Sequence, residues 1–208
     1  MKMNRLVLTV MAAVIMTAAF GQDKRYGIES VVLKKKYFEA NRKKADETVY
    51  IADYGRKESR EKVEVRSTPV EMTTKTFTLV MDGFIYTIVE SFNRRGKSII
   101  GKTAFKVKIT GEGLINMNFL DLTDEIKEKY QIEEKGSEQF LGKECKRYDF
   151  IYPTLEKVTV LVWEGLTLKL TAGFYVEEIT EIQENAVIAS EKFMLPINVH
   201  FQELLGSN

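Results

Sequence analysis

The chain has 208 residues, of which 31 are Lys or Arg and 30 are Asp or Glu, so its formal net charge is +1. A nearly neutral chain with no basic excess does not favour nucleic-acid binding, which needs Lys and Arg gathered on one face. A single cysteine, Cys145, excludes an internal disulfide, so the core must stabilise the fold, and we expect this thiol to be buried.

The first 21 residues have the pattern of a cleaved secretion signal. Two basic residues precede an apolar stretch from Leu6 to Phe20, and small residues at positions 19 and 21 predict cleavage before Gln22. The alternatives are a membrane anchor or a buried element, but the stretch is shorter than the roughly 20 residues that a spanning helix needs. We therefore predict a periplasmic or secreted protein with no transmembrane segment after cleavage. No cysteine follows the stretch, so lipid attachment there is excluded.

Two-residue alternation of apolar and polar side chains predicts strands along most of the remaining chain. The charged segment Leu33–Lys44 is predicted as two strands joined by a polar turn. Further alternating segments are Val63–Arg66, Phe105–Ile109, Glu177–Glu184 and Ile197–Phe201.

A tight hairpin is predicted around Asp82-Gly83, because both central residues of its turn need positive φ and Asp-Gly is favoured there. The resulting register pairs Met81 with Phe84, Leu79 with Tyr86, and Phe77 with Ile88. These six side chains share one apolar face, and the opposite face is far more polar.

One short helix is predicted from Leu122 to Tyr130, where apolar residues recur at four-residue spacing and Asp121 or Thr123 could cap the start. A second hairpin is predicted around Glu164-Gly165. Its register places five large side chains on one face, namely Leu161, Trp163, Leu166, Leu168 and Leu170. The other face has Val158, Val160, Val162, Thr167, Lys169 and Thr171.

Strands outnumber helices so strongly that one short helix cannot cover their apolar face. The sheet must therefore curl on itself, pack on a second sheet, or leave a cavity for an apolar ligand.

Residues suited to catalysis or metal binding are scarce. His200 is the single histidine, and one His with one Cys cannot supply a structural zinc site. The pairs Glu133-Glu134 and Glu177-Glu178 leave a carboxylate-dependent hydrolase open, but neighbours on a strand point to opposite faces, and we expect them to be solvated. We expect no enzyme, no metal and no cofactor.

Two basic runs, Lys34-Lys35-Lys36 and Arg42-Lys43-Lys44, adjoin Tyr37 and Phe38. They could contact an anionic membrane surface, although acidic neighbours dilute the charge and a solvated hairpin also explains them.

The segments Thr48–Lys57, Glu138–Cys145 and Val162–Lys169, in this order, resemble a family of uncharacterised exported proteins of Gram-negative bacteria. That family is similar in architecture to the LolA/LolB-like periplasmic lipoprotein carriers, whose concave apolar sheet, lidded by helices, holds acyl chains. The resemblance implies a mainly β (α+β) fold, with a single curved antiparallel sheet or half-open barrel and one or two short covering helices. It transfers no functional residue, because no binding or catalytic motif is shared.

We therefore predict that residues 22–208 form a single β-rich domain of a periplasmic binding or carrier protein. A lipid, a lipoprotein acyl chain or another apolar ligand would lie in the concavity of the sheet. The residues expected to line it are Phe77, Leu79, Met81, Phe84, Tyr86, Leu161, Trp163, Leu166 and Leu168. The alternatives are a non-catalytic envelope interaction or structural module with a filled core, and a hydrolase of envelope glycans.

Overall fold

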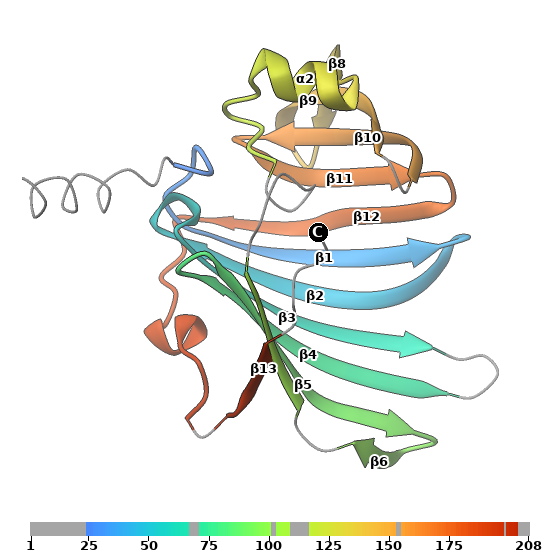
Figure 1. The fold of residues 1–208 in the computed structure, drawn as a ribbon. Coiled ribbons are helices and arrows are strands. Elements are labelled where there is room, and N and C mark those ends of the chain that lie inside the picture. Colours follow the sequence, from blue (N-terminus) through green and yellow to red (C-terminus); the bar gives the residue numbers. More distant parts are fainter. Residues whose placement is uncertain are drawn as a thin grey trace, which may run out of the picture.

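The computed structural model describes residues 24–66, 71–100, 103–108, 117–152, 155–197 and 199–203. The predicted signal segment and its cleavage site lie outside these residues. Thirteen strands form one sheet in the order β13-β7-β5-β4-β3-β2-β1-β12-β11-β10-β9-β8, with β6 paired to β5. The sheet is strongly curved and unclosed (Figure 1). The predicted fold class, mainly β with a single curved sheet that forms a half-open barrel, is confirmed.

The strands of the first half are β1 (Val31–Glu39), β2 (Arg42–Ala52), β3 (Lys57–Arg66), β4 (Met72–Met81), β5 (Phe84–Arg94), β6 (Lys97–Ile100) and β7 (Thr103–Lys108). Those of the second half are β8 (Glu133–Phe140), β9 (Lys143–Tyr152), β10 (Leu155–Trp163), β11 (Leu166–Ala172), β12 (Tyr175–Glu184) and β13 (Phe201–Glu203). The helices are η1 (Asp53–Gly55), α2 (Asp124–Tyr130) and η3 (Ser190–Phe193).

Local chain signals predicted several elements correctly. The segment Leu33–Lys44 is two strands joined at Ala40-Asn41, as expected. In the β4–β5 hairpin the predicted register is confirmed, since Met81 pairs with Phe84. Its turn residues Asp82 and Gly83 have φ of 53° and 75°, the positive values that the hairpin requires.

Helix α2 begins after Thr123, whose hydroxyl accepts a hydrogen bond from the Ile126 amide at 3.3 Å. This is one of the two caps that the sequence suggested. The helix lies over the β8–β9 end of the sheet (Figure 1).

The predicted register of the β10–β11 hairpin is correct at its turn and wrong beyond it. Trp163 pairs with Leu166, but the register shifts between Leu161 and Val162, so that Leu161 pairs with Lys169. Leu170 consequently packs in the cluster that contains the β10 valines. A β-bulge inserts one unpaired residue, and the alternation pattern alone does not locate it.

Two hydrophobic clusters form the core. The first packs Tyr26 and Ile28, which precede β1, against residues of β1, β2, β9, β10, β11 and β12. The second lies under α2 and joins Tyr130 and Ile132 to Phe150 of β9 and the valines of β10. Both faces of the β10–β11 hairpin are therefore covered by other parts of the chain.

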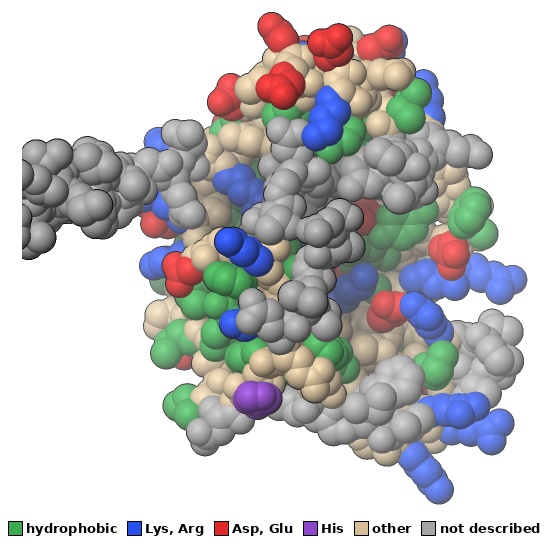
Figure 2. Space-filling model, viewed as in Figure 1, with side chains coloured by type: hydrophobic (Ala, Val, Ile, Leu, Met, Phe, Trp, Pro, Cys, Tyr) green, Lys and Arg blue, Asp and Glu red, His purple; other side chains and the backbone are tan. Residues whose placement is uncertain are grey.

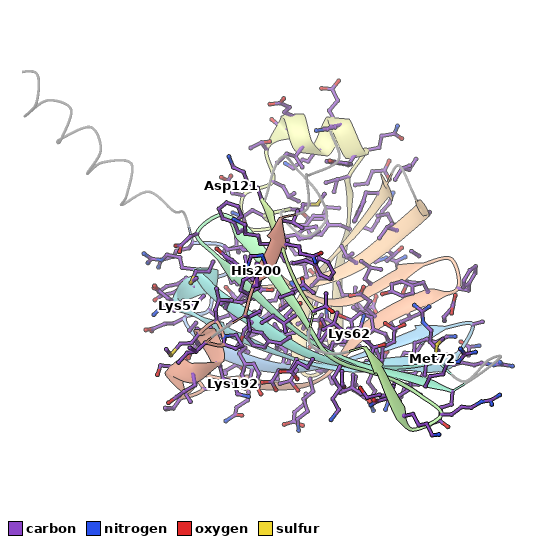
Figure 3. All side chains as sticks on the ribbon, turned by 60° about the horizontal axis from the view of Figure 1, so that its bottom comes forward. Lys57, Lys62, Met72, Asp121, Lys192 and His200 are labelled. Carbon is purple, nitrogen blue, oxygen red and sulfur yellow. The ribbon has the colours of Figure 1, made fainter. Side chains whose placement is uncertain are left out.

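The C-terminal segment follows a course that differs from the prediction. The strand predicted at Ile197–Phe201 is displaced, since β13 spans Phe201–Glu203 and His200 lies exposed just before it (Figure 3). β13 pairs with β7 in parallel, and the Phe201 ring meets the Tyr86 ring edge-on with centroids 5.3 Å apart. Within the described part of the chain, no helix has the length and apolar character needed to cross a membrane.

Candidate functional site

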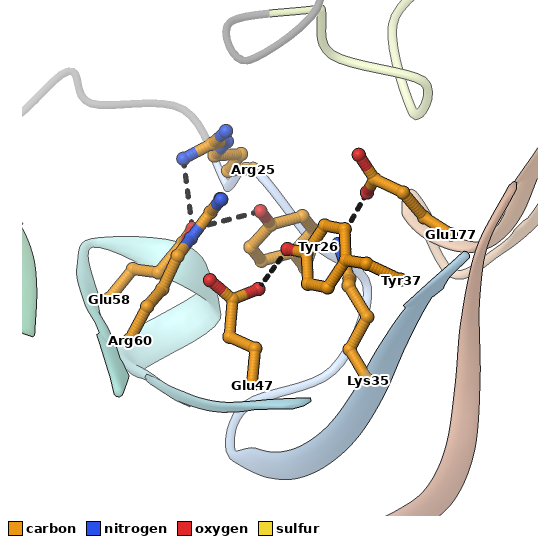
Figure 4. Close-up of polar contacts among 8 residues, drawn as sticks. All are labelled: Arg25, Tyr26, Lys35, Tyr37, Glu47, Glu58, Arg60 and Glu177. Atoms are coloured by element: carbon orange, nitrogen blue, oxygen red, sulfur yellow. Dashed lines mark hydrogen bonds and ion pairs between the residues drawn. The ribbon is translucent and has the colours of Figure 1, made fainter. Parts of the chain in front are cut away.

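A network of buried charges lies within the curve formed by β1, β2, β3 and β12 (Figure 4). Its centre is Glu58, whose side chain is fully buried. The Glu58 carboxylate accepts hydrogen bonds from Arg60 Nε at 2.7 Å, from an Arg25 guanidinium nitrogen at 3.0 Å and from the Tyr26 hydroxyl at 3.0 Å. Arg25 and Tyr26 come from the segment before β1, so this network attaches that segment to the sheet.

The electrostatic balance keeps Glu58 ionised. Burial alone would raise the pKa of its carboxyl, but the positive charges of Arg60 and Arg25 outweigh burial and lower that pKa to about 2. The same pairing with Glu58 raises the pKa of the Arg60 guanidinium. A carboxyl with so low a pKa is a poor proton donor or acceptor near neutral pH. Glu58 therefore suits a structural role.

A second carboxylate, Glu47, lies on the same face, because it pairs with Lys62, four positions along β3 from Glu58. It is buried, and its Oε2 accepts a hydrogen bond from the Tyr37 hydroxyl at 2.5 Å. Burial, followed by the charges of Glu47 and Glu177, raises the pKa of the Tyr37 phenol. Lys62 Nζ lies 4.0 Å from the centre of the Tyr37 ring. Tyr37 thus contacts the Glu47 carboxylate through its hydroxyl and the Lys62 ammonium through its ring.

Glu177 corrects one expectation from the sequence. It was expected to be solvated, but it is partly buried, with Lys35 Nζ 3.1 Å away and the Tyr175 hydroxyl donating to it at 2.8 Å. Burial opposes ionisation, yet Lys35 and the Tyr175 hydrogen bond lower the pKa of this carboxyl. Sequence reasoning missed the whole network, because charged residues at alternate strand positions have the same pattern as a solvated face.

A separate open pocket of about 330 Å³ lies between the segment leading into α2 and strands β8 and β9. Five of the eight residues in its wall are apolar or aromatic, namely Phe119, Leu120, Leu122, Ile132 and Tyr148. Lys127, Glu134 and Lys146 supply the polar part of the lining. The Phe119 and Tyr148 rings lie 5.6 Å apart. Polar atoms supply more than half of the exposed wall, and the volume is at the lower end of the range of small-molecule sites.

The nine residues expected to line a cavity lie in two separate places. Directly paired residues share a face, and Glu58 pairs with Val80, so the neighbouring Leu79 and Met81 project from the opposite side of the sheet. The cross-strand partners Phe84 and Tyr86 share that side, as does Phe77. Strands β3, β2, β1 and β12 separate this group from the second hairpin.

The other four residues belong to the first hydrophobic cluster. Leu161, Leu166 and Leu168 are buried in it, and Trp163 packs against it with Lys143 Nζ 4.5 Å above its ring. None of the nine predicted residues lines the pocket beside α2.

Cys145 is buried in the first hydrophobic cluster, as expected. Burial raises the pKa of its thiol, which disfavours the thiolate that nucleophilic chemistry needs.

Comparison with known proteins gives a similarity of fold. No protein-family model matches the sequence, and no curated protein matches it. An uncharacterised conserved protein from Thermus thermophilus aligns with a TM-score of 0.51 at 6% identity, covering 88% of this chain and 94% of that one. MucB aligns with a TM-score of 0.42 at 10% identity, covering 84% of this chain and 60% of MucB.

A putative outer membrane lipoprotein-sorting protein domain from Vibrio parahaemolyticus aligns with a TM-score of 0.22 at 11% identity, covering 79% of this chain and 89% of that domain. Identities this low show shared fold alone, and the scores for this domain and for MucB are below 0.5. The chain is therefore similar in fold to the uncharacterised Thermus protein over most of the length of both chains.

Proposed function

We propose that this protein is a non-catalytic binding or carrier protein of the bacterial envelope, and that it holds a single apolar chain, such as an acyl chain of a lipid or lipoprotein. The observation that carries the proposal is the open pocket of about 330 Å³ beside α2, with five apolar or aromatic residues in its wall. Its volume favours one chain over a bulky multi-chain lipid.

The β8–β9 end of the curved sheet supports this proposal, because the pocket lies there. The segment Met117–Leu122 and α2 cover that end, and their apolar side chains continue the second hydrophobic cluster into the pocket. Each methylene group that enters such a site contributes about 0.8 kcal/mol of binding free energy. A short acyl chain would therefore bind measurably without any specific polar contact.

The buried charges favour a carrier over a hydrolase. The Glu58 carboxylate is already engaged by two arginines and a tyrosine, and Glu47 and Glu177 each accept a tyrosine hydroxyl. A glycosidase needs one carboxyl with a raised pKa as general acid, whereas neighbouring cations and hydrogen bonds, acting against burial, hold the pKa values of Glu58 and Glu177 below their ordinary range.

The test uses a matched pair of leucines. Leu120 lines the pocket and Leu141 lies in the β8–β9 turn outside it, and both are 45% exposed, so an aspartate at either position is tolerated by the fold. We expect Leu120→Asp to weaken binding of a fluorescent fatty acid by about 10- to 100-fold, the loss of one Leu contact. Leu141→Asp should leave the affinity unchanged.

A third variant separates this pocket from the residues that the sequence suggested. Phe84→Ala removes a large apolar group from the opposite face of the β4–β5 hairpin, remote from the pocket. If Phe84→Ala weakens probe binding and Leu120→Asp does not, the ligand lies on the hairpin and the pocket assignment is wrong. If native mass spectrometry and organic extraction recover no lipid and no probe binds, the carrier proposal itself fails and the interaction-module alternative gains support.

A further inference from the structure

The turns at one end of the sheet form a continuous rim. Because neighbouring strands are antiparallel, the β1–β2, β5–β6 and β11–β12 turns all lie at the end where β4 begins. Figure 3 shows Met72, the first residue of β4, at this end and Lys57 at the other. Six adjacent strands from β12 to β5, about 4.8 Å apart, make the rim about 24 Å wide.

This rim carries seven Lys or Arg residues against four acids, Glu39, Asp46, Glu64 and the exposed Glu71. Three of its bases are matched by acids, since Lys43 pairs with Asp46, Lys44 with Glu39 and Arg66 with Glu64. Four exposed bases remain that have no ion pair within the described residues, namely Arg42, Arg94, Arg95 and Lys97. We call these four residues the basic rim.

Acidic side chains gather at a different place on the molecule. Six acids lie on α2 and the edge strand β8, namely Asp124, Glu125, Glu128, Glu133, Glu134 and Glu138, against three bases of the same elements, Lys127, Lys129 and Lys135. Three of the six acids pair with Lys127, Lys135 or Lys146. Figure 2 shows red side chains over this part of the surface and blue ones around the β5–β6 end. The chain is nearly neutral in total, but bases are in excess at the rim and acids over α2 and β8. This separation of charge would orient the molecule in an electric field.

A large apolar side chain stands beside the basic rim. Phe174, in the β11–β12 turn, is 69% exposed. Its carbonyl accepts a hydrogen bond from the Ala40 amide at 3.0 Å, which holds it next to the β1–β2 turn and Arg42. An aromatic ring exposed next to unpaired cations fits the headgroup region of a bilayer, where rings of this kind insert and cations meet lipid phosphates.

We propose that the basic rim and Phe174 form a docking surface for an anionic lipid bilayer. The lipid phosphates would meet Arg42, Arg94, Arg95 and Lys97, and Phe174 would insert among the headgroups. The acidic α2–β8 region, which holds the pocket, then faces away from the anionic surface. This inference does not depend on the carrier function, because none of the rim residues lines the pocket.

The experiment measures partition of the natively purified protein onto phosphatidylcholine vesicles and onto vesicles with equal parts of phosphatidylglycerol. We expect binding to the mixed vesicles alone, weakening as salt is raised. A base close to an anionic surface contributes about a fivefold factor in partition, so replacing all four rim residues by Ala should lower partition by about 100-fold or more. Phe174→Ala should lower it several-fold and reduce its salt-independent part.

The matched control removes the same charge elsewhere. Arg56, Lys57, Lys108 and Lys135 are exposed bases outside the rim, and their quadruple Ala variant should retain wild-type partition. An equal loss in this control would overturn the proposal, because total charge would then decide binding. The proposal would also be overturned if the rim variant partitioned onto the mixed vesicles as strongly as the wild type. It would be overturned too if the protein were retained on an acidic polymer but did not bind any vesicle.

Discussion

Among single residues, Glu58 has the largest expected influence on stability. Its carboxylate is fully buried, yet it stays charged because Arg60 and Arg25 surround it. A buried ion pair contributes little relative to an apolar replacement, but removal of one partner is costly because the other charge remains. Glu58 therefore helps to attach the segment before β1 to the sheet, together with the backbone hydrogen bonds that Arg25 and Tyr26 donate to the Tyr54 carbonyl.

Glu58 predicts a specific acid sensitivity. Its folded pKa of about 2 is lower than the ordinary value of 4.5, so its stabilising contribution is complete above about pH 4.5 and is lost as the pH falls towards 2. The shift corresponds to about 3 kcal/mol of unfolding free energy. Urea unfolding of the wild type at a series of pH values measures this loss.

The variant Glu58→Gln should lower the free energy of unfolding at neutral pH by about 3 kcal/mol, because two arginines lose their counter-charge. Its stability should also depend less on pH between 4.5 and 2. Glu181→Gln is the control, since Glu181 forms an exposed pair with Lys34 and should cost less than about 1 kcal/mol. Equal pH profiles for wild type and Glu58→Gln would show that Glu58 is not perturbed.

Among the elements, most two-residue hairpin turns share one geometry; the β11–β12 turn differs, since Gly173 has positive φ and Phe174 does not. The pairs Asp82-Gly83, Arg95-Gly96, Leu141-Gly142 and Glu164-Gly165 all have positive φ at both positions. Sequence signals predicted two of them, because Gly in the second position between alternating strands is the strongest local indication of a hairpin. The turn at Ala40-Asn41 has the same geometry without glycine.

Two of these glycines separate two costs of an added Cβ: the cost of the left-handed conformation and the cost of a steric clash. Gly83 and Gly165 have nearly equal φ, +75° and +77°, but a Cβ on Gly83 would meet nothing within 4 Å. A Cβ on Gly165 would lie 2.8 Å from Leu120 Cγ and 3.0 Å from the Arg25 carbonyl oxygen. Gly83→Ala should therefore cost about 1–2 kcal/mol for the left-handed conformation, and Gly165→Ala should cost more.

Thermal or urea unfolding of both glycine variants measures this difference. Gly165→Ala should also weaken probe binding, because Leu120 lines the pocket and would be displaced. If the two alanine variants lose equal stability, the β10–β11 turn does not pack closely against Leu120 and the segment before β1.

For the whole molecule, the unclosed sheet leaves β8 as one terminal strand. Its residues are almost all exposed and include charged side chains on both faces. Charges on an edge strand prevent pairing with a second molecule. We expect the double variant Lys135→Val, Glu138→Val to self-associate, as measured by light scattering at increasing protein concentration.

The matched control is Lys34→Val with Glu181→Val, an exposed ion pair on the interior strands β1 and β12. This variant loses the same charges and gains the same apolar groups, but its strands already have two neighbours. It should remain monodisperse under conditions in which the β8 variant associates. Equal association of both variants would indicate nonspecific hydrophobic association and not pairing of edge strands.

The sequence by itself determined the local structure: most strands, the Asp82-Gly83 turn, the register beside it, and the capped helix α2. These features depend on residues a few positions apart, so short patterns contain the information. The bulge in the β10–β11 hairpin, by contrast, depends on packing on both faces, and alternation alone predicted the wrong partner for Leu161.

Tertiary structure decided which faces are covered, where the pocket lies and how the charges are distributed. Arg25 meets Glu58 from 33 residues away, and Lys35 meets Glu177 from 142 residues away. Such pairs have the same sequence pattern whether they are buried or solvated, because the pattern does not record which strands become neighbours. For the same reason, a nearly neutral composition concealed a molecule with a basic rim at one end of its sheet and an acidic surface over α2 and β8.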